Sequence, residues 1–413
     1  MKDYELWEFP SGLRLVHKRI THTKIAHCGI ILDVGSRDER PHEQGIAHFW
    51  EHMAFKGTTK RKAYHILSRL EGVGGELNAY TTKEKVCFHA SVIESHFEKA
   101  LELLADIAFH STFPEKEIEK EKSVILEEMA MYRDDPSDAI FDNFDEILFP
   151  NHPLGWNIVG TTASIGSFTR QHFLDFVRRN LHNQRIVISV VGNIAFEKAR
   201  YLVQKYFSDL PHYSAQLERE YPQQYQPQRI VQHRHTQQAH CIIGGRTYSL
   251  YDSKRIPFFM LNNLLGGPGM NSRLSMSLRE KHGLVYSIES NYSAYTDVGA
   301  FTIYFATDAA ALDKCRHLVM KELEKLHRQP LGTLQLHRAK QQLKGQLAMA
   351  EESNHGLMLM MGKSILDTGR VESLAEIFDQ IEQVTAADLQ EIACEIFAQD
   401  QLSELVFLPE KSP

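Results

Sequence analysis

The feature that most constrains the fold of this 413-residue chain is that its two halves follow the same plan. Ala79-Tyr80-Thr81 recurs as Ala294-Tyr295-Thr296, an offset of 215 residues. A strand-like run follows each tripeptide, at 86–92 and at 301–307, and an amphipathic helical pattern follows each run. Many α/β proteins show such echoes, but the matched offset favours a duplication. We therefore predict an α+β fold of two duplicated domains, each a largely antiparallel sheet with helices packed on one face.

A change in composition separates the two halves. The segment 208–238 is rich in Gln, is interrupted by Pro and Tyr, and shows no helical or strand period. This predicts a first domain over residues 1–207, an inter-domain linker over 208–238 and a homologous second domain over 239–413. The length agrees, because 413 residues exceed what one hydrophobic core usually organises.

Charge and composition exclude several classes of protein. A formal net charge of -7 gives no electrostatic basis for binding nucleic acid or an anionic membrane, so we expect neither as a partner. The first residues lack the basic and apolar runs of a secretory signal, and the best uncharged run, 257–272, is too short to span a bilayer. The five cysteines are scattered, without a CxxC pair, which is typical of reduced thiols. Together these features predict a cytoplasmic protein.

The sharpest local pattern is His48-Phe49-Trp50-Glu51-His52. Residues four apart lie on one face of a helix, so His48 and His52 can direct two imidazoles at one zinc ion. Glu51 lies close to that face and could deprotonate a water on the metal, as in the inverted zinc-protease motif. A surface helix that happens to carry two histidines would show the same pattern, so the motif alone does not establish a site.

A catalytic zinc site needs a third protein ligand. An acid-rich helix is predicted from about residue 115 to 133, and on it Glu121 and Glu128 are seven residues apart on one face. Glu127 points about 100° away from Glu128. Spacing alone does not choose between Glu127 and Glu128.

With its continuation to Thr58, the histidine motif resembles that of the insulinase/pitrilysin family of zinc metallopeptidases. The likeness is to the two-domain branch, which includes the processing-peptidase β subunit and bacterial relatives, and it extends over nearly the whole chain. Relatives place their third ligand about 76 residues after the second histidine, which here is Glu128. The resemblance therefore implies one Zn²⁺ per chain on His48, His52 and Glu128. Glu121 matches an acid that supports the site in relatives.

Two further stretches extend the likeness. The run 76–81 resembles the edge strand on which relatives hold the backbone of the substrate, which implies substrate binding at Asn78, Ala79 and Tyr80. Arg279 and Tyr286, seven residues apart, resemble the Arg–Tyr pair of the family. The resemblance implies that Tyr286 donates a hydrogen bond to the developing oxyanion and that Arg279 anchors substrate or orients Tyr286.

These expectations define a zinc-dependent metalloendopeptidase that hydrolyses peptides or unfolded polypeptides inside a closed chamber, with Glu51 as the general base. Four-domain relatives supply both halves of the site from one polypeptide. With two domains, we expect a homodimer in which Arg279 and Tyr286 reach the zinc of a partner chain. The alternatives are a catalytically silent binding or assembly subunit of the same fold and a non-proteolytic zinc hydrolase.

Overall fold

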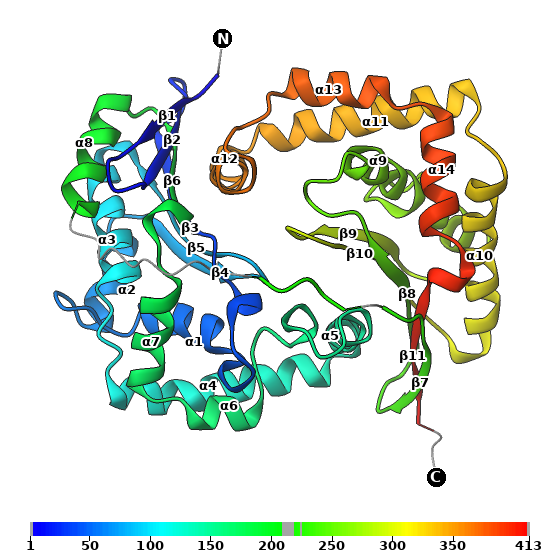
Figure 1. The fold of residues 1–413 in the computed structure, drawn as a ribbon, viewed down its shortest axis with the longest axis horizontal. Helices are drawn as coiled ribbons and strands as arrows, with labels where there is room; N and C mark the ends of the chain where they lie inside the picture. Colours follow the sequence, from blue (N-terminus) through cyan, green and yellow to red (C-terminus); the bar gives the residue numbers. More distant parts are fainter. Residues whose placement is uncertain (1–2, 209–218, 224, 411–413) are drawn as a thin grey trace. The chain divides into compact units, whose positions relative to one another are not determined.

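The computed structural model describes residues 3–208, 219–223 and 225–410 (Figure 1). The chain forms two compact units, and each unit contains segments from both halves of the sequence. The first comprises Met1–Met129, Trp156–Arg219 and Met349–Ser373, and the second comprises Ala130–Gly155, Glu220–Ala348 and Leu374–Pro413.

The first unit is built on a six-stranded sheet with the strand order β1-β2-β6-β3-β5-β4. Neighbouring strands are antiparallel, except that β2 and β6 run parallel. β4 lies at one edge of the sheet and pairs with β5 alone. The strands are β1 (Glu5–Glu8), β2 (Arg14–Arg19), β3 (Ile25–Leu32), β4 (Glu76–Thr81), β5 (Val86–Ile93) and β6 (Ile186–Gly192).

Helices contact both faces of this sheet. α3 packs on β3 and β5, α1 on β4 and α8 on β2, while α12 packs on β3 and β6. The close approach of α12 depends on Gly362, where a Cβ atom would lie 2.4 Å from Cδ1 of Ile31. The helices are α1 (Ile46–Ala54), α2 (Ala63–Glu71), α3 (Phe97–Phe109), α4 (Glu115–Asp134, shared with the second unit), α6 (Thr162–Ser167), α7 (Arg170–Asn180), α8 (Phe196–Phe207) and α12 (Asn354–Thr368).

The second unit repeats this plan with a five-stranded sheet of order β7-β11-β8-β10-β9, in which β7 and β11 run parallel and the other pairs are antiparallel. α5, from the first half of the sequence, packs on β8 and β11. The elements are α5 (Pro136–Leu148), β7 (Arg229–Arg234), β8 (Ala239–Thr247), α9 (Arg255–Gly266), β9 (Ile288–Ala294), β10 (Gly299–Thr307), α10 (Leu312–Arg328), α11 (Thr333–Glu351), α13 (Leu374–Gln383), α14 (Ala386–Ile396) and β11 (Ser403–Pro409).

The predicted fold class is confirmed: the chain is α+β, with two largely antiparallel sheets in duplicated arrangements. The structure adds that α12 and α5 come from the opposite half of the sequence, so that each sheet receives a helix from the other half. The burial of β6 explains why the first sheet needs α12, because all seven residues of this strand are buried. A strand buried on both faces needs a cover on each face.

The prediction that 208–238 lacks strand periodicity was wrong for part of that segment. Residues 209–218 and 224 lie outside the described residues, but 229–234 forms β7. The side chains of β7 alternate between exposed and half-buried, and its backbone pairs with β11 from the far end of the chain. Tertiary pairing thus creates this strand.

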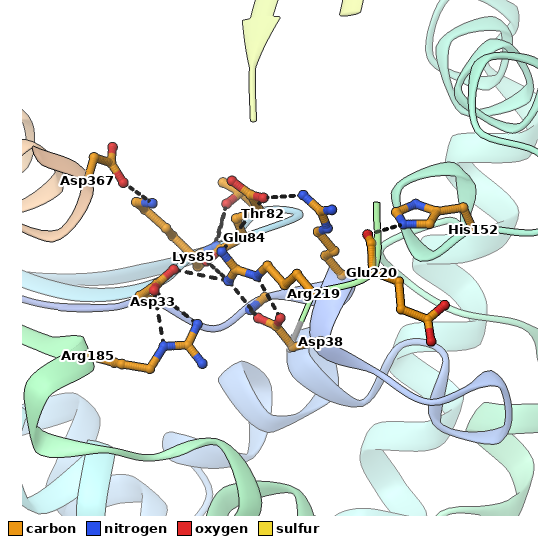
Figure 2. Close-up of polar contacts among 12 residues, drawn as sticks. Asp33, Asp38, Thr82, Glu84, Lys85, His152, Arg185, Arg219, Glu220 and Asp367 are labelled. Carbon is orange, nitrogen blue, oxygen red and sulfur yellow. Dashed lines mark hydrogen bonds and ion pairs between the residues drawn. The ribbon is translucent and has the colours of Figure 1, made fainter. Parts of the chain in front are cut away.

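Arg219 is the first residue of the described stretch 219–223, and ion pairs hold it to the rest of the first unit (Figure 2). Its guanidinium makes ion pairs with Asp33 at 3.0 Å and Asp38 at 2.8 Å. Although burial lowers the pKa of Arg219, the surrounding carboxylates raise it above its ordinary value.

In the second unit, Nε2 of His152 lies 3.0 Å from the backbone oxygen of Glu220. Further ion pairs around Arg219 join Arg37 to Glu84, Arg185 to Asp33 and Lys85 to Asp367.

No helix in the described part of the chain is long and apolar enough to cross a membrane.

Candidate metal centre

The histidine motif lies on α1, whose first turn is fixed by tertiary contacts. Gly45 precedes the helix with φ +91°, and a Cβ there would lie 2.7 Å from the backbone oxygen of Val159. The buried side chain of Glu39 accepts hydrogen bonds of 2.9 Å from the backbone N–H groups of Gly45 and Ala47. An acidic side chain in this position satisfies helix N–H groups that have no partner within the helix.

Burial sets the rotation of α1 about its axis. Phe49 and Trp50 are fully buried, and the Trp50 ring packs edge-on against Phe88 of the sheet at 5.8 Å between centroids. His48 and His52 are therefore left on a face that points away from this core. The helix predicted from the motif is confirmed, and so is the common face of its two histidines.

The structure brings His48, His52 and Glu128 together. Nε2 of His48 lies 3.6 Å from Oε1 of Glu128, and Nε2 of His52 lies 3.5 Å from Oε2. One ligand atom from each residue lies within 4.8 Å of the other two, and these three form the one such His/Cys/Asp/Glu group in the described residues. Two ligands at zinc–nitrogen distances of 2.0–2.1 Å in a tetrahedron are roughly 3.4 Å apart, so this donor set fits zinc.

The protonation of His48 also suits a metal ligand. Burial, together with the smaller effect of the neighbouring His52, lowers the pKa of His48 to about 3. A neutral imidazole offers the lone pair that a metal needs. Nδ1 of His48 is buried and has no hydrogen-bond partner among the described residues.

Glu121 orients the second histidine. Its Oε1 lies 2.9 Å from Nδ1 of His52, and its Oε2 lies 2.7 Å from Nζ of Lys56. Burial raises the pKa of Glu121, but the contacts with His52 and Lys56 outweigh it and hold this pKa below its usual value. An ionised carboxylate only accepts hydrogen bonds, so Nδ1 of His52 must donate and Nε2 is left free for a metal.

Glu51 lies beside this group without belonging to it. Its Oε2 accepts a 2.6 Å hydrogen bond from Oγ1 of Thr81, the last residue of β4. Burial raises the pKa of Glu51, while the bond from Thr81 and the nearby His52 oppose that rise. A carboxylate with a raised pKa next to a metal site is suited to proton transfer.

Asn78, Ala79 and Tyr80 lie on β4, and β4 is an edge strand as the sequence predicted. Oδ1 of Asn78 accepts a hydrogen bond of 2.8 Å from the N–H of Ala79. Substrate binding by these residues stays a prediction.

Arg279 and Tyr286 belong to the second unit. Arg279 lies in a π-helical turn, η6 (Ser275–Glu280), and its Cζ atom is 5.7 Å from the centre of the Tyr286 ring. Tyr286 is 87% exposed. The structure therefore pairs the two side chains with each other, and their action at a zinc site stays a prediction.

Sequence reasoning missed Glu39, Lys56 and the role of Thr81. Lys56 follows His52 by four residues but lies beyond the end of α1 at Ala54, so helical spacing does not place it beside Glu121. Thr81 was part of the predicted edge strand, but its contact with Glu51 depends on how α1 meets β4. Nothing in the local sequence marks Glu39 as the residue that fixes the first turn of α1.

Comparisons with known proteins agree with this fold. Residues 14–162 match the family model for insulinase (peptidase family M16), and residues 167–343 match the model described as the peptidase M16 inactive domain. The chain is 34% identical to an uncharacterized zinc protease of Bacillus subtilis over 96% of each chain. It is 33% identical to an uncharacterized zinc protease of Rickettsia bellii over 98% of each chain.

Solved structures share the fold. A protease from Helicobacter pylori superposes with a TM-score of 0.91 at 23% identity, covering 98% of this chain and 99% of that one. A Pseudomonas fluorescens structure described as a peptidase M16 inactive domain superposes with a TM-score of 0.92 at 19% identity, covering 100% of this chain and 99% of that one.

Fold and donor set together are those of a two-domain peptidase-like protein with a candidate zinc centre. The chain belongs to the insulinase family, peptidase family M16. His48, Glu51, His52, Glu121 and Glu128 all lie in the part that matches the first family model.

Proposed function

We propose that the protein is a zinc-dependent metalloendopeptidase that hydrolyses peptides or unfolded polypeptides inside a closed chamber. The observation that carries this proposal is the convergence of His48, His52 and Glu128, with the half-buried carboxyl group of Glu51 beside them. These three ligands would hold one Zn²⁺. When bound, zinc polarises the scissile carbonyl and lowers the pKa of a water molecule from 15.7 to about 7.

The chain's own residues would handle the proton and the substrate. Glu51 takes the proton from the attacking water and delivers it to the leaving amine. Thr81 orients Glu51 through its hydrogen bond, and Glu121 holds the imidazole of His52 in the tautomer that can bind metal. The free edge of β4 at Asn78, Ala79 and Tyr80 would pair with the backbone of an extended peptide.

Arg279 and Tyr286 would complete the site from a partner chain, so we propose that the active form is a homodimer. Tyr286 would donate a hydrogen bond to the oxyanion, and Arg279 would anchor substrate or orient the Tyr286 ring. The proximity of the two side chains and the exposure of Tyr286 support a role in contacting something outside their own unit.

We also propose a cytoplasmic location. All five cysteines are free thiols, and four of them are buried. Burial raises the pKa of Cys28 to about 12, so this thiol stays protonated and unreactive. Free thiols are typical of a reducing compartment.

The Glu51→Gln variant tests the enzyme function. The amide keeps the shape of the side chain but cannot take a proton, so we expect zinc content unchanged and cleavage of an unstructured peptide abolished. Glu127→Gln is the matched control, because Glu127 is exposed and adjacent to Glu128. It should keep both zinc and activity. Peptide cleavage by Glu51→Gln protein would refute the assignment of the base.

The alternatives make different predictions in the same assay. A silent binding or assembly subunit would hold zinc but fail to cleave peptides even as the wild type. A non-proteolytic zinc hydrolase would leave peptides intact and hydrolyse other substrates.

A further inference from the structure

The turn between β4 and β5, residues 82–85, begins directly after Thr81, whose hydroxyl bonds to the proposed general base. All three charged side chains of this turn are buried. Buried charges are costly unless they are paired and hydrogen-bonded, so the turn is held in place by specific partners. Lys83 donates to the backbone oxygen of Trp156, Glu84 pairs with Arg37, and Lys85 pairs with Asp367.

One short segment, residues 35–39, lies against the backbone of this turn. The N–H of Ser36 donates to the oxygen of Thr82 at 3.1 Å, and the N–H of Arg37 donates to the oxygen of Lys83 at 2.7 Å. The close approach requires a glycine at position 35, where a Cβ atom would lie 2.5 Å from the backbone oxygen of Lys83. Segment 35–39 therefore fixes the position of the turn through main-chain hydrogen bonds.

The same segment also fixes α1. Its last residue, Glu39, accepts the two hydrogen bonds from the first turn of that helix, and the 3-10 turn η1 (Ser36–Asp38) contacts α1 as well. α1 carries Glu51 and β4 carries Thr81. Segment 35–39 is therefore bonded to both of the elements that form the hydrogen bond between Thr81 and Glu51.

Arg219 joins this segment to the turn with a single guanidinium group (Figure 2). Its Nε and Nη2 donate to the two carboxylate oxygens of Asp38 at 2.8 and 2.9 Å, and Nη2 also donates to the backbone oxygen of Glu84 at 3.3 Å. The carboxylate of Asp38 in turn accepts a 3.0 Å bond from the N–H of Gly35. A bidentate guanidinium contact fixes geometry as well as charge. Arg219 is also the residue at which the chain leaves the first unit.

We propose that Arg219 is a positioning residue for catalysis, which holds Thr81 against the carboxylate of Glu51 by locking segment 35–39 to the turn. In the described part of the chain, Arg219 bonds neither to Glu51 nor to a metal ligand, so its effect passes through these intermediate contacts. The proposal rests on the proposed peptidase function, because the position of Glu51 matters for turnover only if Glu51 moves a proton. It connects the end of the first unit to the base of that unit.

A double-mutant cycle between Arg219 and Thr81 tests this path. Arg219→Gln removes the charge and the bidentate contact, and we expect kcat for an unstructured peptide to fall about tenfold, with KM and zinc content nearly unchanged. If Arg219 acts through the hydroxyl of Thr81, the same substitution in Thr81→Val protein should lower kcat by less than about twofold, because coupled effects do not add.

Arg185→Gln is the matched control. The side chain of Arg185 pairs with Asp33 at 3.0 Å, as that of Arg219 does, but in the described residues it bonds neither to segment 35–39 nor to the turn. This variant should keep the kcat of the wild type. Arg219→Lys replaces the glutamine variant if the latter does not fold, since lysine keeps the charge but cannot form the bidentate contact.

Two kinetic results would overturn the proposal and leave the peptidase standing. One is a wild-type kcat in folded Arg219→Gln or Arg219→Lys protein, and the other is an undiminished loss of kcat when the substitution is made in Thr81→Val protein. If the wild type cleaves no peptide, hydrogen–deuterium exchange decides. Faster exchange over 35–47 and 81–86 in the Arg219 variant than in Arg185→Gln supports the positioning role, and equal exchange overturns it.

Discussion

Thr81 connects the edge strand to the proposed general base, and the contact depends on a single hydroxyl group. We predict that Thr81→Val lowers kcat about ten- to a hundredfold, because a hydrogen bond to an ionised group is worth roughly 1.5–3 kcal/mol. Valine keeps the shape of the side chain, so KM and zinc content should change little. Steady-state kinetics and metal analysis check this.

Thr81→Ser is the matched control for that experiment. Serine restores the hydroxyl and should return kcat to near the wild-type value. A Thr81→Val enzyme with wild-type kcat, or a Thr81→Ser enzyme as slow as the valine variant, would show that the hydroxyl does not position Glu51.

At the scale of single residues, the sequence predicted what helical spacing determines. His48 and His52 follow from their i, i+4 spacing, but the choice between Glu127 and Glu128 required the family resemblance. The structure supplies the physical reason through α4, whose buried residues lie on one face with Glu121, while Glu127 is exposed. Contacts between elements, such as Thr81 with Glu51, leave no local pattern in the sequence.

At the scale of elements, Arg219 anchors the chain to the first unit through buried charges. We predict that Arg219→Ala destabilises the first unit by about 3–5 kcal/mol, because Asp38 would lose its buried partner, while Asp33 would keep Arg185. The side chain of Asp38 is fully buried, so water cannot replace the lost contact there. Urea unfolding followed by tryptophan fluorescence measures this selectively, since Trp7, Trp50 and Trp156 all belong to the first unit.

Arg229→Ala provides the matched control, because Arg229 is exposed on β7. It should leave the tryptophan transition in place. A transition of the Arg219→Ala protein that coincides with that of the wild type would mean that these ion pairs contribute no net stability.

The elements themselves were largely predictable, and their partners were not. The runs 86–92 and 301–307 appear as β5 and β10, and the acid-rich helix appears as α4, because each has a clear local period. The placement of α12 and α5 was not predictable, since amphipathic helices show which face is apolar but not which sheet covers it. β6, buried on both faces, was a local sign of a second covering layer.

At the scale of the whole molecule, the residues proposed for catalysis are divided between the two compact units. The candidate zinc ligands and Glu51 lie in the first unit, and Arg279 and Tyr286 lie in the second. If each site in a homodimer takes its Arg–Tyr pair from the partner chain, two different inactive variants should complement each other. We therefore predict that mixing Glu51→Gln protein with Arg279→Ala protein restores activity.

The expected recovery follows from counting sites. Random exchange makes about half of the dimers mixed, and each mixed dimer has one site with an intact Glu51 and a partner-derived Arg279, which gives roughly a quarter of the wild-type rate. The control mixes Glu51→Gln with Glu128→Gln protein, where both defects lie in the first unit and no intact site can form. Labelled subunits verify exchange by energy transfer. If the subunits exchange but peptide cleavage does not recover, the partner-chain prediction is wrong. Arg279 would then act on the zinc site of its own chain or take no part in catalysis.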